Sequence, residues 1–303
     1  MSLDNYLNLK YIRECSRERV DLIGHALNRF PSLARNLDGL QSGLYIVGAE
    51  TNIGKTAFMT NLFLNAIQSN EHIKGIYFSF DDNKDTIINR FLAILTALDI
   101  NQVQSPKSLS PALGTTLMNI GYDCLKKLAL SNRLAIYDMN DVNNFEEVTN
   151  IIEQNKNNNL IVCIDGIYNL SINTTTSSIR EENILRANKL KILVDLYKIP
   201  LITSVEVRKK NNTQQTPTID DIMETSKFGY NANVVFMLYP ENFQEFKEQN
   251  DPYLIINVEK NKLSAFKGVM RLRFLKSKGY MIGEEIQNDF VNILKAISIA
   301  SKS

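Results

Sequence analysis

Histidine and cysteine are scarce in this chain of 303 residues. His25 and His72 are the only histidines, so the sequence disfavours a histidine-ligated metal site and a Ser-His-Asp triad. The three cysteines, Cys15, Cys124 and Cys163, are far apart, odd in number and without metal-ligand spacing. They predict reduced thiols, as is usual in the cytosol, and not a disulfide framework.

The chain also lacks an excess of charge of either sign and any long apolar run. Its net charge is +1, which does not indicate a nucleic-acid binder, although a local basic loop could still contact phosphates. No signal-peptide core appears at the amino terminus, and no stretch reaches the ~18 apolar residues of a membrane span. We therefore expect a cytoplasmic protein with no membrane partner. A hydrophobic content of 44% with 22% charged residues suits one or two globular domains with a sizeable core.

The most informative stretch covers residues 44–65. An apolar run at 44–47 is followed by a turn of small residues and then by a helical pattern. Because the backbone N–H groups at the start of a helix converge on one spot, this context suits phosphate binding. The strict phosphate-binding pattern has glycine at the position of Ala49, and Gly48 lies one place earlier. We expect the nucleotide to be bound by Gly48, Ala49, Glu50, Thr51, Asn52, Ile53, Gly54, Lys55, Thr56 and Ala57.

Three residues of this loop have distinct predicted roles. Gly54 lets the backbone approach the phosphates, the Lys55 ammonium meets the charge of the β- and γ-phosphates, and the Thr56 hydroxyl binds Mg²⁺. The predicted cofactors are therefore ATP and Mg²⁺. The alternative is a glycine-containing turn with a surface lysine, which the flanking strand and helix patterns disfavour.

Two further apolar runs end in an acid. The run at 75–80 leads into Asp81 and Asp82, and we expect it to form a strand next to the phosphate-loop strand. Asp81 would then polarise the water that attacks the γ-phosphate, and the alternative is that Asp81 or Asp82 caps the following helix at 86–98. The run at 160–165 has the form of a Walker B strand, whose Asp165 would reach the Mg²⁺.

The other patterns predict an α/β protein. Helical spacing at 3–37, broken by Pro31, predicts two or three helices that pack either on their own domain or on a neighbouring subunit. Further helices are expected at 111–130, 141–155, 184–197 and 284–300, and loops at 101–111, 171–183 and 208–220. Further strands are expected at 134–137, 200–207, 233–239, 253–260, 269–274 and 280–282, with the strands at 253–260 and 269–274 paired antiparallel.

This order of elements resembles a RecA-like core and, over residues 37–282, the carboxyl-terminal ATPase domain of DnaB-type replicative helicases. The likeness is carried by the segment 37–43, by Ala49, by the strand that ends at Asp81 with Arg90 nine residues on, and by Asp165. The resemblance implies a P-loop NTPase core with a mostly parallel central sheet, helices on both faces and a carboxyl-terminal antiparallel hairpin. We do not expect this chain to hold the family's separate amino-terminal domain, which forms a collar and helps to recruit primase.

We accordingly expect three parts. These are a helical appendage at 1–36, the RecA-like ATPase domain at 37–283 and an amphipathic carboxyl-terminal helix at 284–303.

Some positions differ from the family's pattern. Asp81 stands where the family has glutamate, and the family's glutamine on the strand at 204–208 is replaced by Val205 or, with a slip of one residue, by Glu206. Lys260 and Lys262 fall where the family places a lysine and an arginine finger that reach a neighbour's nucleotide. A lysine still offers positive charge there, without the planar fork of arginine. The alternative is that both lysines are ordinary exposed hairpin charges. The resemblance thus implies a catalytic set of Lys55, Asp81, Lys260 and Lys262.

The loops at 171–183 and 208–220 match those that hold single-stranded DNA in the helicases, where Arg180, Arg208, Lys209 and Lys210 would contact phosphates. The resemblance implies an ATP-dependent DNA helicase or translocase that forms a homo-oligomeric ring, with a hexamer as the expected size. Primase or a loader are candidate partners. Two alternatives stay open: a RecA-like ATPase of assembly or signalling type, and a degenerate helicase-associated loader that binds ATP without unwinding.

Overall fold

The computed structural model describes residues 22–105, 111–156, 159–174, 178–209 and 216–286. Several predicted features lie outside these residues, namely the first part of the appendage, all but the start of the helix at 284–300, Cys15 and Lys210. Cys124 and Cys163 are free cysteines, as predicted.

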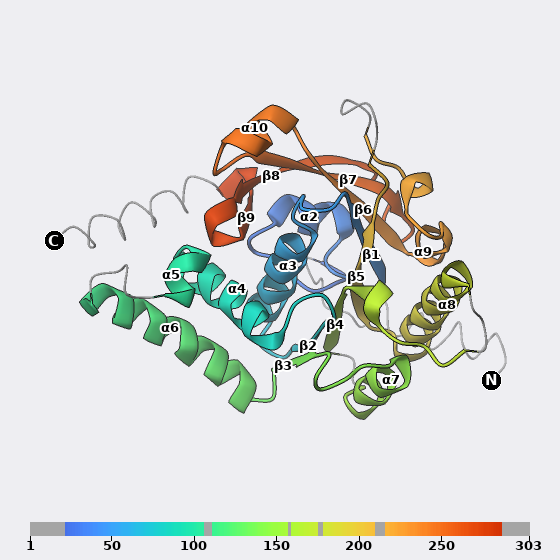
Figure 1. Ribbon diagram of the computed structural model, residues 1–303, viewed down its shortest axis with the longest axis horizontal. Helices are drawn as coiled ribbons and strands as arrows, with labels where there is room; N and C mark the ends of the chain where they lie inside the picture. Colours follow the sequence, from blue (N-terminus) through green and yellow to red (C-terminus); the bar gives the residue numbers. More distant parts are fainter. Residues whose placement is uncertain (1–21, 106–110, 157–158, 175–177, 210–215, 287–303) are drawn as a thin grey trace.

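A nine-stranded sheet forms the centre of the protein (Figure 1). Its strands are β1 (Gly43–Ala49), β2 (Lys74–Ser79), β3 (Leu134–Asp138), β4 (Leu160–Asp165), β5 (Pro200–Glu206), β6 (Val234–Pro240), β7 (Tyr253–Asn261), β8 (Gly268–Leu275) and β9 (Tyr280–Gly283). They are arranged in the order β3-β2-β4-β5-β1-β6-β7-β8-β9. All pairs from β3 to β6 are parallel, whereas β6 to β9 pair antiparallel. This arrangement confirms the predicted mostly parallel sheet with a carboxyl-terminal antiparallel part.

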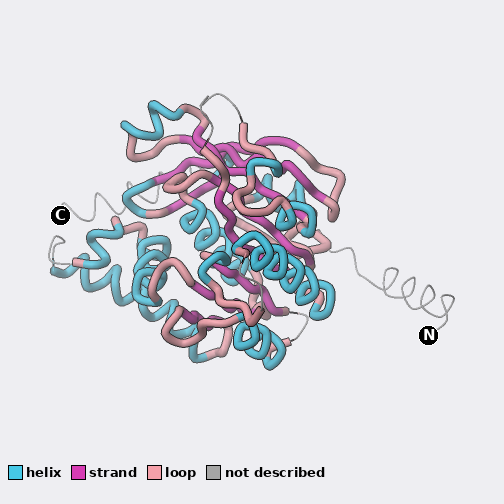
Figure 2. The backbone as a smooth tube through the Cα atoms, turned by 45° about the vertical axis from the view of Figure 1, so that its right-hand side comes forward, coloured by secondary structure: helices cyan, strands magenta, loops and turns pink. Residues whose placement is uncertain are grey.

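Helices cover both faces of the sheet (Figure 2). Since side chains alternate along a strand, Tyr45 and Val47 of β1 enter one hydrophobic core while Leu44 and Ile46 enter the other. The first core is covered by α2 (Pro31–Leu37), α3 (Lys55–Ser69), α4 (Lys84–Thr96), α5 (Ile100–Gln104), α6 (Pro111–Leu130) and α10 (Phe243–Glu248). The second is covered by α7 (Phe145–Gln154), α8 (Ile179–Tyr197) and α9 (Lys227–Asn231). None of the described helices combines the length and apolarity needed to cross a membrane.

The segment before the sheet differs from its prediction. Residues 22–30 are not helical, and Pro31 begins α2 instead of breaking a helix. The fixed φ of proline suits the first position of a helix, where no N–H is needed. Leu27 and Phe30 are buried in the first core, so the described part of the appendage packs on its own domain.

Two predicted loops are partly helical. α8 begins at Ile179 and not at residue 184, so Arg180 lies in its first turn beside two acids that favour the positive end of a helix. α5, residues 100–104, overlaps the start of the predicted loop at 101–111, and Asp99 and Gln102 form a capping box at its amino-terminal end.

Candidate functional site

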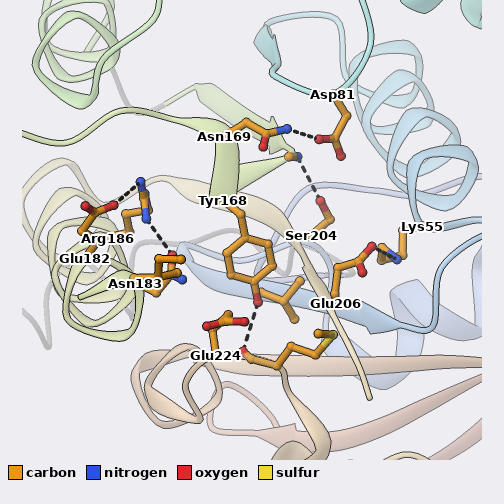
Figure 3. A pocket seen from close by; sticks show the side chains of 14 residues that line it. Lys55, Asp81, Tyr168, Asn169, Glu182, Asn183, Arg186, Ser204, Glu206 and Glu224 are labelled. Carbon is orange, nitrogen blue, oxygen red and sulfur yellow. Dashed lines mark hydrogen bonds and ion pairs between the residues drawn. The ribbon is translucent and has the colours of Figure 1, made fainter. Parts of the chain in front are cut away.

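The carboxyl ends of four parallel strands lie along one edge of the sheet. Ala49 at the end of β1 pairs with Glu206 of β5, and Ser79 of β2 pairs with Asp165 of β4. Ligands of open parallel sheets bind outside these strand ends. A cavity of about 440 Å³ lies there, lined by Lys55, Asp81, Gly166, Tyr168, Asn169, Ile179, Glu182, Asn183, Arg186, Ser204, Val205, Glu206, Met223 and Glu224 (Figure 3).

The predicted phosphate loop joins β1 to α3. Gly48 and Ala49 end β1, residues 50–54 form the turn, and Lys55 begins α3. Gly54 has φ of 114°, in the left-handed region that favours glycine. The first turn of α3 has no side-chain cap and no acid, so the positive end of a 15-residue helix is available to an anion.

The Lys55 ammonium is held by the loop and by β5. Its Nζ lies 3.1 Å from the Ala49 carbonyl oxygen, 3.2 Å from that of Glu50 and 3.3 Å from Oε1 of Glu206. The Thr51 hydroxyl donates to the other Glu206 oxygen at 3.1 Å. Glu206 therefore connects the turn and the lysine to the end of β5. Val205 is only 1% exposed and belongs to the second core, so of the two residues left open by the sequence it is Glu206 that faces Lys55.

Asp81 reaches this cavity from a strand that is not adjacent to β1. We predicted that β2 lies next to β1, and this prediction was wrong, because β4 and β5 lie between them. The chain after β2 stays with β4, as the Phe80 N–H donates to the Asp165 carbonyl at 2.9 Å. The predicted capping alternative is also wrong, because Asn83 caps α4 by accepting from the Thr86 N–H.

The Asp81 carboxylate accepts a hydrogen bond of 2.5 Å from the Asn169 amide. Burial raises its pKa above the usual value, and the nearby carboxylates of Asp165, Asp82 and Glu206 raise it further, whereas Lys55 acts in the opposite direction. The carboxylates of Asp81, Asp82, Asp165 and Glu206 are therefore close enough to influence one another, and the Lys55 ammonium partly offsets their charge.

Asp165 is almost fully buried, at 2% exposure, and both of its carboxylate oxygens accept hydrogen bonds. Ser204 donates to Oδ1 at 2.6 Å, and Tyr77 donates to Oδ2 at 3.3 Å. Burial and the charge of Asp165 raise the pKa of Tyr77 well above its usual value, so the tyrosine stays protonated as a donor. These bonds fix the orientation of the carboxylate.

No group of three or more histidine, cysteine, aspartate or glutamate side chains within the described ranges is arranged to hold a metal ion. A divalent cation next to Asp165 would therefore need phosphate oxygens or water among its ligands, as Mg²⁺ commonly has.

Sequence reasoning missed several residues of the cavity wall. Asn169 follows the turn at Gly166, which has φ of 78° and directs the chain back toward Asp81. The Arg186 guanidinium is engaged by the Leu170 carbonyl, the Asn183 amide oxygen and the Glu182 carboxylate. A glycine directly after a Walker B strand was the available signal for Asn169. Glu182 and Asn183 precede Arg186 by four and three residues, which is helical spacing, but this signal was lost because residues 171–183 were predicted to form a loop.

The described residues predicted to contact a neighbour's nucleotide or DNA are not among those that line this cavity. The Lys260 ammonium donates to the carbonyls of Gly229 and Tyr230 at 2.7 and 2.9 Å. Burial, and after it the charges of the nearby lysines, lowers the pKa of Lys260 to about 8. The remaining predicted residues within the described ranges are all exposed, namely Arg180, Arg208, Lys209 and Lys262.

The chain matches the family described as the DnaB-like helicase C terminal domain over residues 27–280. It belongs to this family. A replicative DNA helicase DnaB of Helicobacter pylori strain J99 is 25% identical over 204 residues, which are 66% of this chain and 40% of that helicase. The replicative DNA helicase DnaB of Geobacillus stearothermophilus is 23% identical over 272 residues, which are 87% of this chain and 58% of that protein. The chain thus spans about half the length of these DnaB relatives.

Solved structures support the predicted fold. A solved structure described as an ATPase domain superimposes with a TM-score of 0.80 at 17% identity, covering 93% of this chain and 98% of that one. A DnaB-like replicative helicase, described with its interactions with primase, gives a TM-score of 0.79 at 17% identity, covering 93% of this chain and 68% of that one. At such low identity the likeness shows the fold alone, and it confirms the predicted RecA-like fold.

Proposed function

We propose that this chain is the ATPase part of a DnaB-type DNA helicase or translocase. It would bind ATP with Mg²⁺, hydrolyse it at the interfaces of a homo-oligomeric ring and move along single-stranded DNA in the cytoplasm. One observation supports this proposal most. Lys55 and the uncapped start of α3 lie at the same edge of the sheet as Asp81 and Asp165, the acids that follow or end two of its strands. Cation, helix dipole and carboxylates are what phosphoryl transfer requires.

The residues have separate roles in this proposal. The N–H groups at the turn and the Lys55 ammonium would bind phosphate oxygens, and Asp81 would orient the attacking water. Thr56 and Asp165 would hold Mg²⁺, which when bound neutralises phosphate charge. The fit is good for Asp165, because its two bonds from Ser204 and Tyr77 hold the carboxylate in one orientation.

Contacts between subunits and with DNA complete the proposal. Lys260 and Lys262 would act on a neighbour's nucleotide, and the basic residues Arg180, Arg208, Lys209 and Lys210 would contact DNA phosphates. Such binding would weaken with salt and be indifferent to sequence, since none of these residues reads bases in the proposal. Primase is a candidate partner, because one structural relative is described with its interactions with primase.

The test is steady-state ATP hydrolysis with and without single-stranded DNA, at low and moderate salt. We expect clear stimulation by DNA, which falls as salt is raised, and no turnover by Lys55→Ala. Hydrolysis at the wild-type rate by Lys55→Ala would exclude the phosphate loop as the site.

Two contacts favour a second candidate, which is an ATPase of assembly type or a helicase-associated loader that binds ATP but hydrolyses it very slowly. Lys55 is already paired with Glu206, and the short Asp81 side chain is tied to Asn169. ATP binding with no turnover in either DNA condition would support this candidate over the helicase.

A further inference from the structure

The phosphate-loop lysine has a carboxylate partner in this protein. The Glu206 Oε1 lies 3.3 Å from Lys55 Nζ, and the Lys55 side chain is only 13% exposed, so solvent does not replace this contact freely. The pairing of Ala49 with Glu206 in the β1–β5 ladder fixes the backbone from which the carboxylate projects. Figure 3 shows the two side chains directed toward each other at the wall of the cavity.

Besides Lys55, the side chains that line the cavity offer little positive charge to another anion. The cavity is lined by four acids and two basic residues, and Arg186 is already held by Glu182 and two other acceptors. Asp81 is tied to Asn169 on the other side. A terminal phosphate that contacts Lys55 must therefore replace Glu206 as the partner of the ammonium, while the displaced carboxylate stays attached to β5 close by.

We propose that Glu206 is a specificity-determining residue that holds Lys55 in the nucleotide-free site and opposes a triphosphate more strongly than a diphosphate. This inference rests on the proposed ATP site. Two like charges a few ångströms apart in a partly enclosed site repel each other appreciably. A diphosphate leaves the outermost phosphate position empty, and so it meets less of this repulsion.

The experiment compares Glu206→Gln with the wild-type full chain. Glutamine keeps the shape of the side chain and an oxygen that can accept from Lys55 and Thr51, but it removes the charge. The probes are fluorescent derivatives of ADP and of a non-hydrolysable ATP analogue, each with Mg²⁺, and the measured quantity is the Kd. We expect Glu206→Gln to bind the triphosphate about tenfold more tightly and the diphosphate less than about threefold more tightly, a tenfold change being about 1.4 kcal/mol.

Glu224→Gln is the matched control, because Glu224 lines the same cavity but lies outside the contacts of Lys55. It should change either Kd by less than about threefold, which corresponds to less than about 0.7 kcal/mol. Thermal unfolding of both variants verifies that they fold.

The inference is overturned if Glu206→Gln binds the triphosphate no more tightly than wild type, or if both nucleotides gain equally. An equal gain in Glu224→Gln would also overturn it, because the effect would then be one of general cavity charge. Unchanged binding with lost turnover would instead make Glu206 a group that acts on the reaction. If wild type and Lys55→Ala bind both nucleotides alike, the ATP site itself is wrong and this inference fails with it.

Discussion

Gly166 offers a sharp test of where Asp81 must lie. This glycine follows Asp165 with φ of 78°, and a Cβ added to it would be 2.6 Å from both Cγ and Oδ1 of Asp81. The same Cβ would be 2.9 Å from the Asp81 backbone nitrogen, which cannot rotate away. Ordinary contacts begin at 3.4 Å, so the change Gly166→Ala must move the carboxylate by about 0.8 Å.

Two effects of Gly166→Ala can be estimated separately. An acid displaced by about 1 Å from its working geometry costs on the order of 10²-fold in rate. A residue other than glycine in the left-handed region costs about 1–2 kcal/mol of folding stability. We therefore expect ATP turnover to fall about 100-fold, nucleotide binding to change less than about threefold, and the free energy of unfolding to fall by at least about 1–2 kcal/mol.

Gly279→Ala is the matched control for backbone strain. Gly279 also has a left-handed φ, of 57°, but its added Cβ would meet only Ile100 Cδ1 at 3.3 Å, and Gly279 does not line the cavity. Urea unfolding should show the loss due to backbone strain in both variants and a larger total loss in Gly166→Ala, because its added Cβ also overlaps Asp81, and only Gly166→Ala should lose turnover. Near-wild-type turnover in Gly166→Ala, or an equal loss in Gly279→Ala, would refute the argument that the position of Asp81 sets the rate.

Three further variants test other parts of the site. Ser204→Ala removes the 2.6 Å hydrogen bond to the buried Asp165 carboxylate, which should lower the free energy of unfolding, measured in urea, by about 1.5–3 kcal/mol. It should also raise the Mg²⁺ concentration needed for turnover, and an unchanged Mg²⁺ requirement would contradict this prediction. Asp81→Asn should be more stable than wild type at neutral pH, because the fold raises the pKa of Asp81 and the ionised carboxylate then costs free energy of folding. This gain in stability should vanish below the ordinary pKa of 3.8, where the carboxyl group is protonated in both the folded and the unfolded chain. A gain that persists there would point to another cause. Lys260 has a pKa of about 8, so it should lose its charge, and the assembled ring its turnover, as the pH rises through that value. Lys260→Arg should move this fall in turnover to higher pH. Identical pH profiles would show that Lys260 takes no part in the reaction.

Much of the sheet could be predicted from the sequence, because its central strands are buried on both faces and read as continuous apolar runs. The runs that became β1 and β4 are fully buried along their lengths. The neighbours of each strand could not be predicted in the same way. The chain passes from β1 to β2 across the places later taken by β4 and β5, and nothing in the first two strands indicates that others will lie between them.

The sequence predicted those residues of the candidate site that belong to one local motif. It missed residues that come into contact only in the folded chain, far from their partners in sequence. Lys55 belongs to a strand, turn and helix that can be read together, and Asp165 ends a typical apolar run. Asn169 binds Asp81 from 88 residues away, and Arg186 binds the Leu170 carbonyl that precedes its helix. The short helices α9 and α10 hold too few residues for a helical period to appear.

The end of β5 shows how strand geometry couples two features of the site. Alternate residues of a strand point to the same face, so Ser204 and Glu206 share one face while Val205 enters the core on the other. Ser204 orients Asp165 and Glu206 binds Lys55, and one strand therefore positions both the acid proposed for the metal and the lysine proposed for the phosphates. The backbone at Glu206 is held by its pairing with Ala49 of β1 and by the Met223 N–H, which donates to the Glu206 carbonyl at 2.9 Å, so a movement of Glu206 away from Lys55 is expected to come from its side chain. In the proposed site, exchange of Glu206 for a phosphate would thus be a local event at the strand end, and the orientation of Asp165 should persist through it.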